Sequence, residues 1–321
     1  MVKLSLVMPR QPDERWQLAK QVGVTDTVIH PLEFGSEKTH WSYDDLLGTK
    51  NWLENAGLNF TVLEGSVPLT DRVRLGRDGR DEDIAEFKQF LRDCGDLGIP
   101  VVCYDWMAGV RWARTAAHVG SRGGSYVTGY DHEKMREGPD AAAADVTRDQ
   151  VWEAIEYFLN EVVPVAEEAG VKLGLHPDDP PRDSVRDIPR IANSVENYDR
   201  ILDVYDSEHN GVTLGQGNFA AMGVDIPETI RHFGEKINFA HFRDVEGDAD
   251  RFVETWHDDG PTDMQAAMDA YHDAGFDGPI RPDHVPTMAG EDNSNPGYHT
   301  KGTLFAIGYM RGLQESAEEE A

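Results

Sequence analysis

Three stretches of the chain each place a histidine at the end of a short apolar run. His176 and His241 end two of these runs, and Asp283 with His284 closes the third. Imidazole nitrogens combined with a carboxylate oxygen suit Mn²⁺, Fe²⁺, Co²⁺, Ni²⁺ or Zn²⁺, and such a set leaves positions open for water or substrate oxygens. Each histidine taken alone is more often a packed strand-end residue. Three candidate ligands at corresponding positions favour a metal site.

Short apolar runs alternate with amphipathic runs along the whole chain. The apolar runs predict strands over 3–8, 26–30, 59–64, 100–106, 172–176, 211–214, 237–243 and 279–283. The amphipathic runs predict helices over 13–22, 42–56, 82–97, 147–169, 195–205, 227–233, 264–274 and 303–314. Thr147 and Gln150 have the spacing of a capping box at the start of one helix. The turn 177–181 holds three prolines, which end the strand before it.

Eight strand-helix units most simply close into an α/β (β/α)8 TIM barrel, here expected as one domain over 1–321. A doubly wound open sheet is the alternative, but the glycines do not form a dinucleotide fingerprint. In a TIM barrel the carboxyl ends of the strands face one cavity, so the candidate ligands should meet there. The loops 107–145 and 285–301 are unusually long, and we expect them at the active site.

The composition narrows the classes of partner. The chain has 59 acidic and 30 basic residues and a net charge of −29, which disfavours nucleic acid and anionic membrane as partners. Neither a run of about 20 apolar residues nor a signal-peptide pattern is present. Cys94 and Cys103 have no CxxC spacing, so a reducing, cytoplasmic location is expected. The dispersed acidity is typical of a protein from a salt-loving organism.

Four motifs resemble those of the bacterial mannonate dehydratase family, which belongs to the xylose-isomerase-like TIM barrels. They are HPDDPP at 176–181, HFRDV at 241–245, RPDH at 281–284 and VCYDWM at 102–107. The resemblance covers most of the chain in matching order. It implies a Mn²⁺- or Fe²⁺-dependent lyase that dehydrates D-mannonate to 2-keto-3-deoxy-D-gluconate in hexuronate breakdown.

The resemblance also implies residue roles. Three of the family's metal ligands fall on His176, His241 and Asp283, and its catalytic pair falls on His284 and Tyr298. The elimination needs a base for the proton at C2 and an acid for the departing C3 hydroxyl, and these two residues are expected to divide the roles.

The resemblance leaves one ligand position open. The family's fourth ligand is a cysteine, and the matching position here is Gly215, so water, substrate or the neighbouring Gln216 or Asn218 would complete the set. Neither Cys94 nor Cys103 is expected to replace that cysteine. The site should be harder and should bind its metal more weakly than one with a thiolate.

An anionic substrate requires local cations in so acidic a chain. Arg243 and Arg281 are expected to bind the substrate carboxylate, with Trp106 and Asp178 also in the substrate-binding region. The loop 107–145 supplies further arginines and aromatic residues that could form a lid: Arg111, Arg114, Arg122, Trp112 and Tyr126. His40, His132 and His257 show no partner pattern and are expected at the surface.

Other readings remain open from the sequence. A sugar isomerase or epimerase of the same barrel class would use more carboxylate ligands, whereas the strand over 172–176 ends in His176. An endonuclease-like protein would need a basic face. A paralogue acting on another aldonate, or an inactive binding protein that lost its metal, also fits. The sequence does not fix the oligomeric state, and a homodimer is the expectation.

The net charge makes a testable prediction. Raising NaCl from about 0.1 to about 1 M shortens the Debye length from about 10 to about 3 Å and screens self-repulsion. We therefore expect the midpoint of thermal unfolding, measured by circular dichroism, to rise with salt. A midpoint that stays constant or falls would contradict this account of the surface charge.

Overall fold

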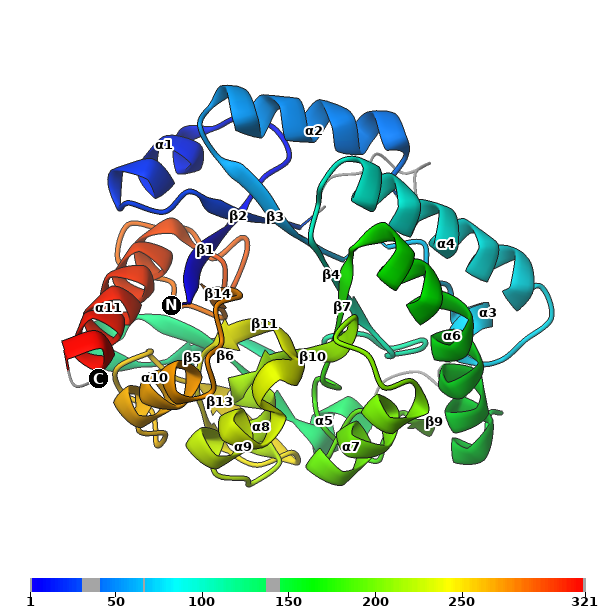
Figure 1. The fold of residues 1–321 in the computed structure, drawn as a ribbon. Coiled ribbons are helices and arrows are strands. Elements are labelled where there is room, and N and C mark those ends of the chain that lie inside the picture. The colour runs from blue at the N-terminus through cyan, green and yellow to red at the C-terminus, as the bar shows by residue number, and fades with distance from the viewer. Residues whose placement is uncertain (1, 31–40, 66, 137–144, 320–321) are drawn as a thin grey trace.

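Eight parallel strands close into a barrel in the computed structural model (Figure 1). The structure describes residues 2–30, 41–65, 67–136 and 145–319. Around the barrel the strands follow the order β1, β14, β11, β10, β7, β4, β3, β2, and β2 pairs again with β1. Their bounds are β1 Lys3–Met8, β2 Asp26–Ile29, β3 Asn59–Glu64, β4 Val101–Asp105, β7 Lys172–His176, β10 Asn210–Gly215, β11 Ile237–Phe242 and β14 Pro279–Pro282. The closed sheet confirms the predicted TIM barrel and excludes the open sheet.

The helices lie outside the barrel and cover its strands (Figure 1). The longer ones are α1 Glu14–Gln21, α2 Tyr43–Asn55, α4 Arg80–Asp96, α6 Arg148–Ala169, α7 Val195–Val204, α9 Ile226–Phe233, α10 Met264–Asp273 and α11 Thr300–Glu319. The predicted capping box of Thr147 and Gln150 is present at the start of α6. Three short helices were not predicted: α3 Asp71–Arg74, α5 His132–Arg136 and α8 Gln216–Ala221.

A cluster of apolar side chains lies inside the barrel. Val28, Val62 and Phe239 belong to one buried cluster inside the sheet, and their flanking residues pack outward against the helices. Because side chains on a strand alternate between its faces, the residue two positions further on points inward as well. The layer above this cluster, at the carboxyl ends of the strands, therefore contains His30, Glu64 and His241.

A second, antiparallel sheet lies beside the barrel at residues that were expected to be loop. Its strands, in order, are β12 Val245–Gly247, β13 Arg251–Glu254, β6 Tyr126–Asp131 and β5 Ala116–Gly120. The loop 107–145 thus contains two strands and α5, while its residues 137–144 lie outside the described residues. The local pattern did not predict β6 because its partner β13 comes from a distant part of the chain. A short hairpin of β8 Ser184–Val185 and β9 Ile188–Pro189 follows β7.

The structure also bears on the histidines expected at the surface and on membrane-spanning helices. His257 is 1% exposed, so its predicted surface position is wrong. His40 lies outside the described residues. Among the described residues, none of the helices combines the length and the apolar character needed to cross a membrane.

The contact between α4 and α6 makes a prediction about stability. A Cβ added at Gly95 of α4 would lie 2.4 Å from the carbonyl oxygen of Ala169 at the end of α6. Gly95→Ala should therefore lower the free energy of unfolding by roughly 1–3 kcal/mol, as overpacking does. Urea denaturation at equilibrium measures this change.

The matched control is Gly48→Ala on α2, where an added Cβ meets nothing within 4 Å. Removing a glycine from an open helix position should raise the free energy of unfolding by about 0.5–1 kcal/mol. Equal shifts in the two variants would mean that the close approach of α4 to Ala169 does not limit position 95.

Candidate active site

A cavity of about 260 Å³ opens at the carboxyl ends of the barrel strands. Side chains from β3, β7, β11 and the residues after β2 and β14 line it, among them His30, Glu64, His176, His241, Asp283 and His284. Each of these side chains follows a buried strand segment, which fixes its backbone. The structure thus brings the three predicted ligands and the predicted catalytic histidine to one cavity.

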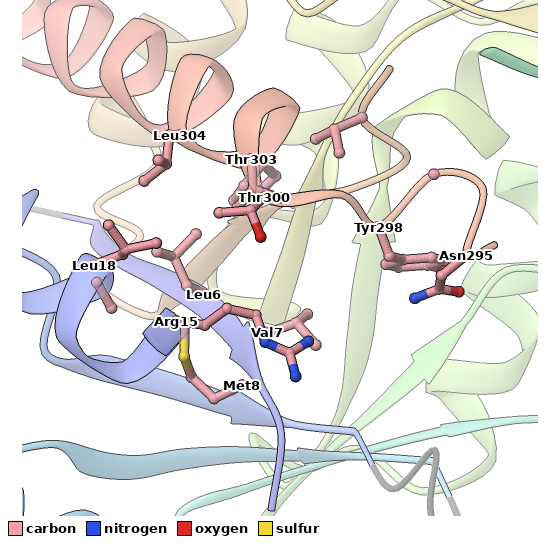
Figure 2. Close-up of a pocket in the computed structure, with 14 residues that line it drawn as sticks. Leu6, Val7, Met8, Arg15, Leu18, Asn295, Tyr298, Thr300, Thr303 and Leu304 are labelled. Carbon is pink, nitrogen blue, oxygen red and sulfur yellow. The ribbon is translucent and has the colours of Figure 1, made fainter. Parts of the chain in front are cut away.

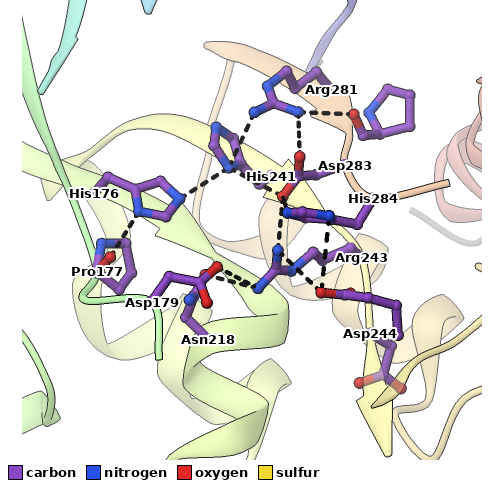
Figure 3. Close-up of polar contacts among 12 residues, drawn as sticks. His176, Pro177, Asp179, Asn218, His241, Arg243, Asp244, Arg281, Asp283 and His284 are labelled. Carbon is purple, nitrogen blue, oxygen red and sulfur yellow. Dashed lines mark hydrogen bonds and ion pairs between the residues drawn. The ribbon is translucent and has the colours of Figure 1, made fainter. Parts of the chain in front are cut away.

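His176 presents a defined nitrogen to this cavity. It is the last residue of β7, and its Nδ1 lies 2.7 Å from the carbonyl oxygen of Pro177 (Figure 3). Because a carbonyl can only accept, Nδ1 carries the proton and Nε2 keeps a lone pair. Burial, followed by the nearby His241, lowers the pKa of His176 to about 4. The ring is therefore neutral near pH 7, as a metal ligand must be.

His241 lies between the other two predicted ligands. Its Nδ1 is 3.2 Å from Nε2 of His176 and 3.7 Å from Oδ2 of Asp283 (Figure 3). Arg281 donates toward the same Nδ1 at 3.5 Å, which assigns the lone pair to that nitrogen. Two imidazole lone pairs therefore face each other across 3.2 Å beside a carboxylate. A divalent cation fits this donor set.

A neighbouring set of donors was missed by the sequence analysis. Among the described residues, Glu64, Cys103 and His241 each offer a ligand atom, and these atoms all lie within 4.8 Å of one another. Cys103 therefore lies close to the predicted ligand His241, and the expectation that it does not replace the family's cysteine stays a prediction. Burial and then Glu64 raise the pKa of the Cys103 thiol, so it stays protonated unless a metal displaces the proton.

Glu64 also faces the other edge of the His241 ring. Its Oε1 lies 3.3 Å from Nε2 of His241, and this carboxylate favours a proton on that nitrogen. Metal-binding histidines commonly present their second ring nitrogen to a carboxylate, which fixes the ring. The alternation of side chains along β3 was a signal that could have found Glu64, since Val62 already points into the barrel.

The predicted carboxylate-binding arginines are committed to buried acids. Arg281 donates to both oxygens of Glu64, at 2.7 and 2.9 Å, and to Oδ1 of Asp283 at 2.7 Å. Arg243 donates to Oδ2 of Asp283 at 3.0 Å and to Asp179 at 3.3 Å. Of the two, Arg281 lines the cavity. Burial alone would raise the pKa of Asp283, but the two arginines and His284 hold it well below its usual range.

Arg114, from the loop after β4, also lines the cavity. Its guanidinium donates to both oxygens of Asp179, at 2.6 and 3.0 Å, and to Glu254 at 2.7 Å. It also lies 3.3 Å from Nε2 of His284. Arg114 therefore ties the second sheet, through Glu254 of β13, to the mouth of the barrel.

The predicted catalytic pair lies at the edge of the same cavity. His284 has a φ of +46°, a backbone conformation that is uncommon outside glycine and that often marks functional sites. The rings of His284 and Tyr298 are 5.3 Å apart, and the Tyr298 hydroxyl donates to Oδ1 of Asp283 at 3.5 Å. Gly297, with a φ of +90°, allows the close approach, since a Cβ there would lie 2.9 Å from Nδ1 of His284.

The surroundings shift the pKa values of His284 and Tyr298 in opposite directions. Burial, assisted by Arg114 and Arg243 against the opposing effect of Asp283, holds the pKa of His284 well below its usual value. Burial and Asp283 raise the pKa of Tyr298. At neutral pH the site therefore presents a neutral imidazole and a protonated phenol.

Tyr298 also separates the active-site cavity from a smaller one. The second cavity, of about 60 Å³, lies between β1, α1 and α11 and shares Val7, Asn295 and Tyr298 with the first (Figure 2). Its walls are mostly apolar, with Leu6 and Leu304 among the side chains drawn. Tyr298 therefore packs against apolar side chains on one face and lines the active-site cavity on the other.

Two predicted substrate-binding residues do not line the cavity. Trp106 is 2% exposed and packs in the core, with its ring 5.1 Å from that of Phe158. Asp178 is buried and accepts from the backbone N–H of Ala192 at 2.8 Å. Trp112 and Asp179 line the cavity in their place.

The open fourth-ligand region is closely packed. A Cβ added at Gly215 would lie 2.6 Å from Oδ1 of Asn218, so a side chain there would displace Asn218. Gln216 is fully buried at the start of α8, does not line the cavity, and its amide has no hydrogen-bond partner among the residues that the structure describes. Neither position therefore presents a side chain to the cavity.

Comparisons with known proteins agree with this geometry. A family model described as D-mannonate dehydratase (UxuA) matches residues 15–143 and 139–321. The chain belongs to the D-mannonate dehydratase family. Mannonate dehydratase 2 of Halalkalibacterium halodurans is 34% identical over 306 residues, which cover 86% of this chain and 88% of that protein. Mannonate dehydratase of Thermotoga maritima is 34% identical over 316 residues, covering 87% of each.

Solved structures place the family within its fold. The crystal structure of mannonate dehydratase from Streptococcus suis serotype 2 matches with a TM-score of 0.92 at 30% identity, covering 100% of this chain and 96% of that one. A D-tagatose 3-epimerase-like protein matches with a TM-score of 0.65 at 13% identity and shares the fold. Membership of the mannonate dehydratase family and the xylose-isomerase-like barrel are thus confirmed.

The pairing of Arg281 makes a prediction about stability. Arg281→Met would leave Glu64 without its two charged hydrogen bonds inside the barrel. We expect the free energy of unfolding to fall by about 3–5 kcal/mol, as for other buried ion pairs that lose one partner. Chemical denaturation measures it.

Arg231→Met is the matched control, because Arg231 pairs with Asp273 where both side chains are about half exposed. It should cost less than about 1 kcal/mol. An Arg281 variant that is as stable as this control would show that Glu64 does not need its partner.

Proposed function

We propose that this protein catalyses the dehydration of D-mannonate to 2-keto-3-deoxy-D-gluconate and water. The observation behind the proposal is the meeting, in one cavity of a mannonate dehydratase family member, of His176, His241 and Asp283 with His284 and Tyr298. An elimination from a sugar acid needs a group that stabilises charge, a base and an acid. His284 and Tyr298 can supply the base and the acid. His176, His241 and Asp283 can hold the metal ion that would stabilise the charge.

His176, His241 and Asp283 would hold the divalent metal. When bound, a divalent cation stabilises the negative charge that develops on the substrate carboxylate and hydroxyl oxygens as the C2 proton leaves. Around the site the carboxylates of Glu64, Asp179, Asp283 and Glu254 pair with the guanidiniums of Arg114, Arg243 and Arg281. Four acids against three bases leave a net negative charge, which favours a cation and, with it, an anionic substrate.

His284 is suited to take the proton from C2. Its ring is neutral at pH 7, and Arg114 donates to Nε2, which assigns the ring proton to Nδ1 and leaves the lone pair on Nε2. Once the ring is protonated, Asp283, whose Oδ2 lies 3.8 Å from Nε2, stabilises the imidazolium. The His284 side chain lines the cavity in which the substrate would bind.

Tyr298 is suited to protonate the departing C3 hydroxyl. Its raised pKa keeps the phenol protonated, so the group can donate a proton as the C3–O bond breaks. The proton lost by Tyr298 ends in the water released. The enol left at C2 and C3 then becomes the 2-keto product by gaining a proton at C3 and losing its C2 hydroxyl proton. The extra proton on His284 and the proton missing from Tyr298 cancel, so both groups can return to their starting states. The sequence left the acid and base roles open, and we assign the base to His284 and the acid to Tyr298 because the first is neutral and the second protonated in this site.

A sugar epimerase is the second candidate, since the barrel is shared with such proteins. The side chains at the cavity argue against it. β7 ends in His176 rather than a carboxylate, and Glu64 and Asp283 are both paired with Arg281. A metal held mainly by carboxylates is therefore not favoured here.

Several expectations from the sequence stay predictions. They are Mn²⁺ or Fe²⁺ as the metal, a cytoplasmic location, a homodimer, the absence of a nucleic-acid partner and an origin in a salt-loving organism. A replacement of thiolate by oxygen or water near Gly215 favours Mn²⁺ over softer metals.

The proposed reaction is tested with a colour assay for 2-keto-3-deoxy acids. Protein purified in high salt and supplied with Mn²⁺ should convert D-mannonate, and EDTA should stop the conversion. His284→Asn and Tyr298→Phe should each lower kcat by about 10²–10⁴-fold, the usual contribution of a general base or acid.

His272→Asn is the control, because His272 is exposed on α10, away from the cavity. It should leave kcat unchanged. Metal-loaded protein that converts none of a panel of aldonates would contradict the dehydratase and favour the epimerase.

A further inference from the structure

One histidine of the cavity has no part in the proposed reaction. His30 follows β2 directly and lines the same cavity as His176, His241 and His284. Its Nδ1 is shielded from solvent and has no hydrogen-bond partner among the described residues. Nε2 is therefore the nitrogen through which this ring can reach a ligand.

Gly65 and Trp112 pack around the imidazole ring of His30. Gly65, with a φ of +80°, lies beneath it, and a Cβ added there would lie 3.3 Å from Nε2 of His30. Trp112 packs edge-on to His30, with ring centroids 6.4 Å apart, and also edge-on to His176 at 6.1 Å. Trp112 thus links the β2 side of the cavity to the β7 side.

The order of strands places His30 on the side of the cavity that faces β10. In the closed ring of eight strands, β2 lies opposite β10. The residues proposed to hold the metal end β7, β11 and β14, on either side of β10 and beyond it. If a six-carbon acid is bound there by its carboxylate end, its remaining hydroxyl-bearing carbons extend across the cavity, whose β2 side is lined by His30.

The chemistry of the ring suits a hydroxyl group. Burial lowers the pKa of His30, so its imidazole is neutral near pH 7. A neutral imidazole can donate one hydrogen bond and accept another, as a hydroxyl does. A site that hydrogen-bonds a substrate hydroxyl rejects analogues that lack it, because its own polar group then stays unpaired.

We propose that His30 binds a hydroxyl group in the tail of the sugar acid, beyond the reacting carbons C2 and C3. His30 is then a specificity-determining residue that selects the chain length and configuration of the aldonate. The assignment rests on the proposed function for its substrate class.

Binding is measured first, without turnover. In Mn²⁺-loaded His284→Asn, isothermal titration calorimetry compares D-mannonate with the four-carbon aldonate of the same C2 and C3 configuration. Adding His30→Ala should weaken D-mannonate binding by about 10- to 100-fold, the scale of one lost hydrogen bond in a desolvated site. It should weaken binding of the four-carbon acid by less than about threefold.

Kinetics then separate this role from a structural one. His30→Ala alone should lower kcat/KM for D-mannonate by about 10- to 100-fold. His30→Gln, which keeps a donor and an acceptor, should recover part of that loss. His272→Ala on exposed α10 is the control and should change neither value.

The two proposals fail in different ways. Unchanged D-mannonate binding in the His30→Ala background, equal losses for both ligands, or no binding of D-mannonate would overturn the role of His30. A protein that converts no aldonate would contradict the dehydratase, yet a tail-dependent loss in calorimetry would still assign the subsite to His30.

Discussion

The site depends on the pairing of buried carboxylates with buried guanidiniums. Glu64, Asp179 and Asp283 are each at most 3% exposed, and each lies within hydrogen-bond distance of an arginine. An isolated charge in such surroundings would be expensive, so each acid depends on its partner. Because these residues come from different strand ends, the network forms when the barrel closes. Folding and the electrostatics of the cavity are therefore coupled.

The same pairing involves the two arginines that were expected to bind substrate, and that role stays a prediction. Arg243 and Arg281 neutralise acids that would repel an anionic substrate and that would, if protonated, be poor ligands. The remaining charge on the network is negative. In the proposed function, a bound cation would attract the substrate carboxylate in this highly acidic chain.

Much of this arrangement could be read from the sequence. The strand-helix alternation predicts a barrel, and a barrel brings His176, His241 and Asp283 together without knowledge of any contact. The alternation of side chains also predicts that Glu64 and His30 point inward, two positions after Val62 and Val28. The same alternation predicts that Trp106 points away from the barrel interior, because Cys103 and Asp105 lie on the inward-facing side of β4. These three placements were available in the pattern of buried strands.

Other features could not be predicted locally. The pairing of β6 with β13 joins segments more than a hundred residues apart. Which buried carboxylate each arginine pairs with depends on how the side chains are placed in the folded barrel. The proximity of Cys103 to His241 depends on which side chains of β4 point inward and on how the neighbouring strands of the barrel are aligned. Long-range geometry, rather than local propensity, decides each of them.

The most direct test of the account is the position of the metal. Crystals soaked in Mn²⁺ would be measured near the manganese absorption edge, and the anomalous difference map would show the ion. The account predicts one peak about 2.0–2.3 Å from Nε2 of His176, a ring nitrogen of His241 and a carboxylate oxygen of Asp283. A peak held instead by Glu64, Cys103 and His241, or no peak at the mouth of the barrel, would contradict it.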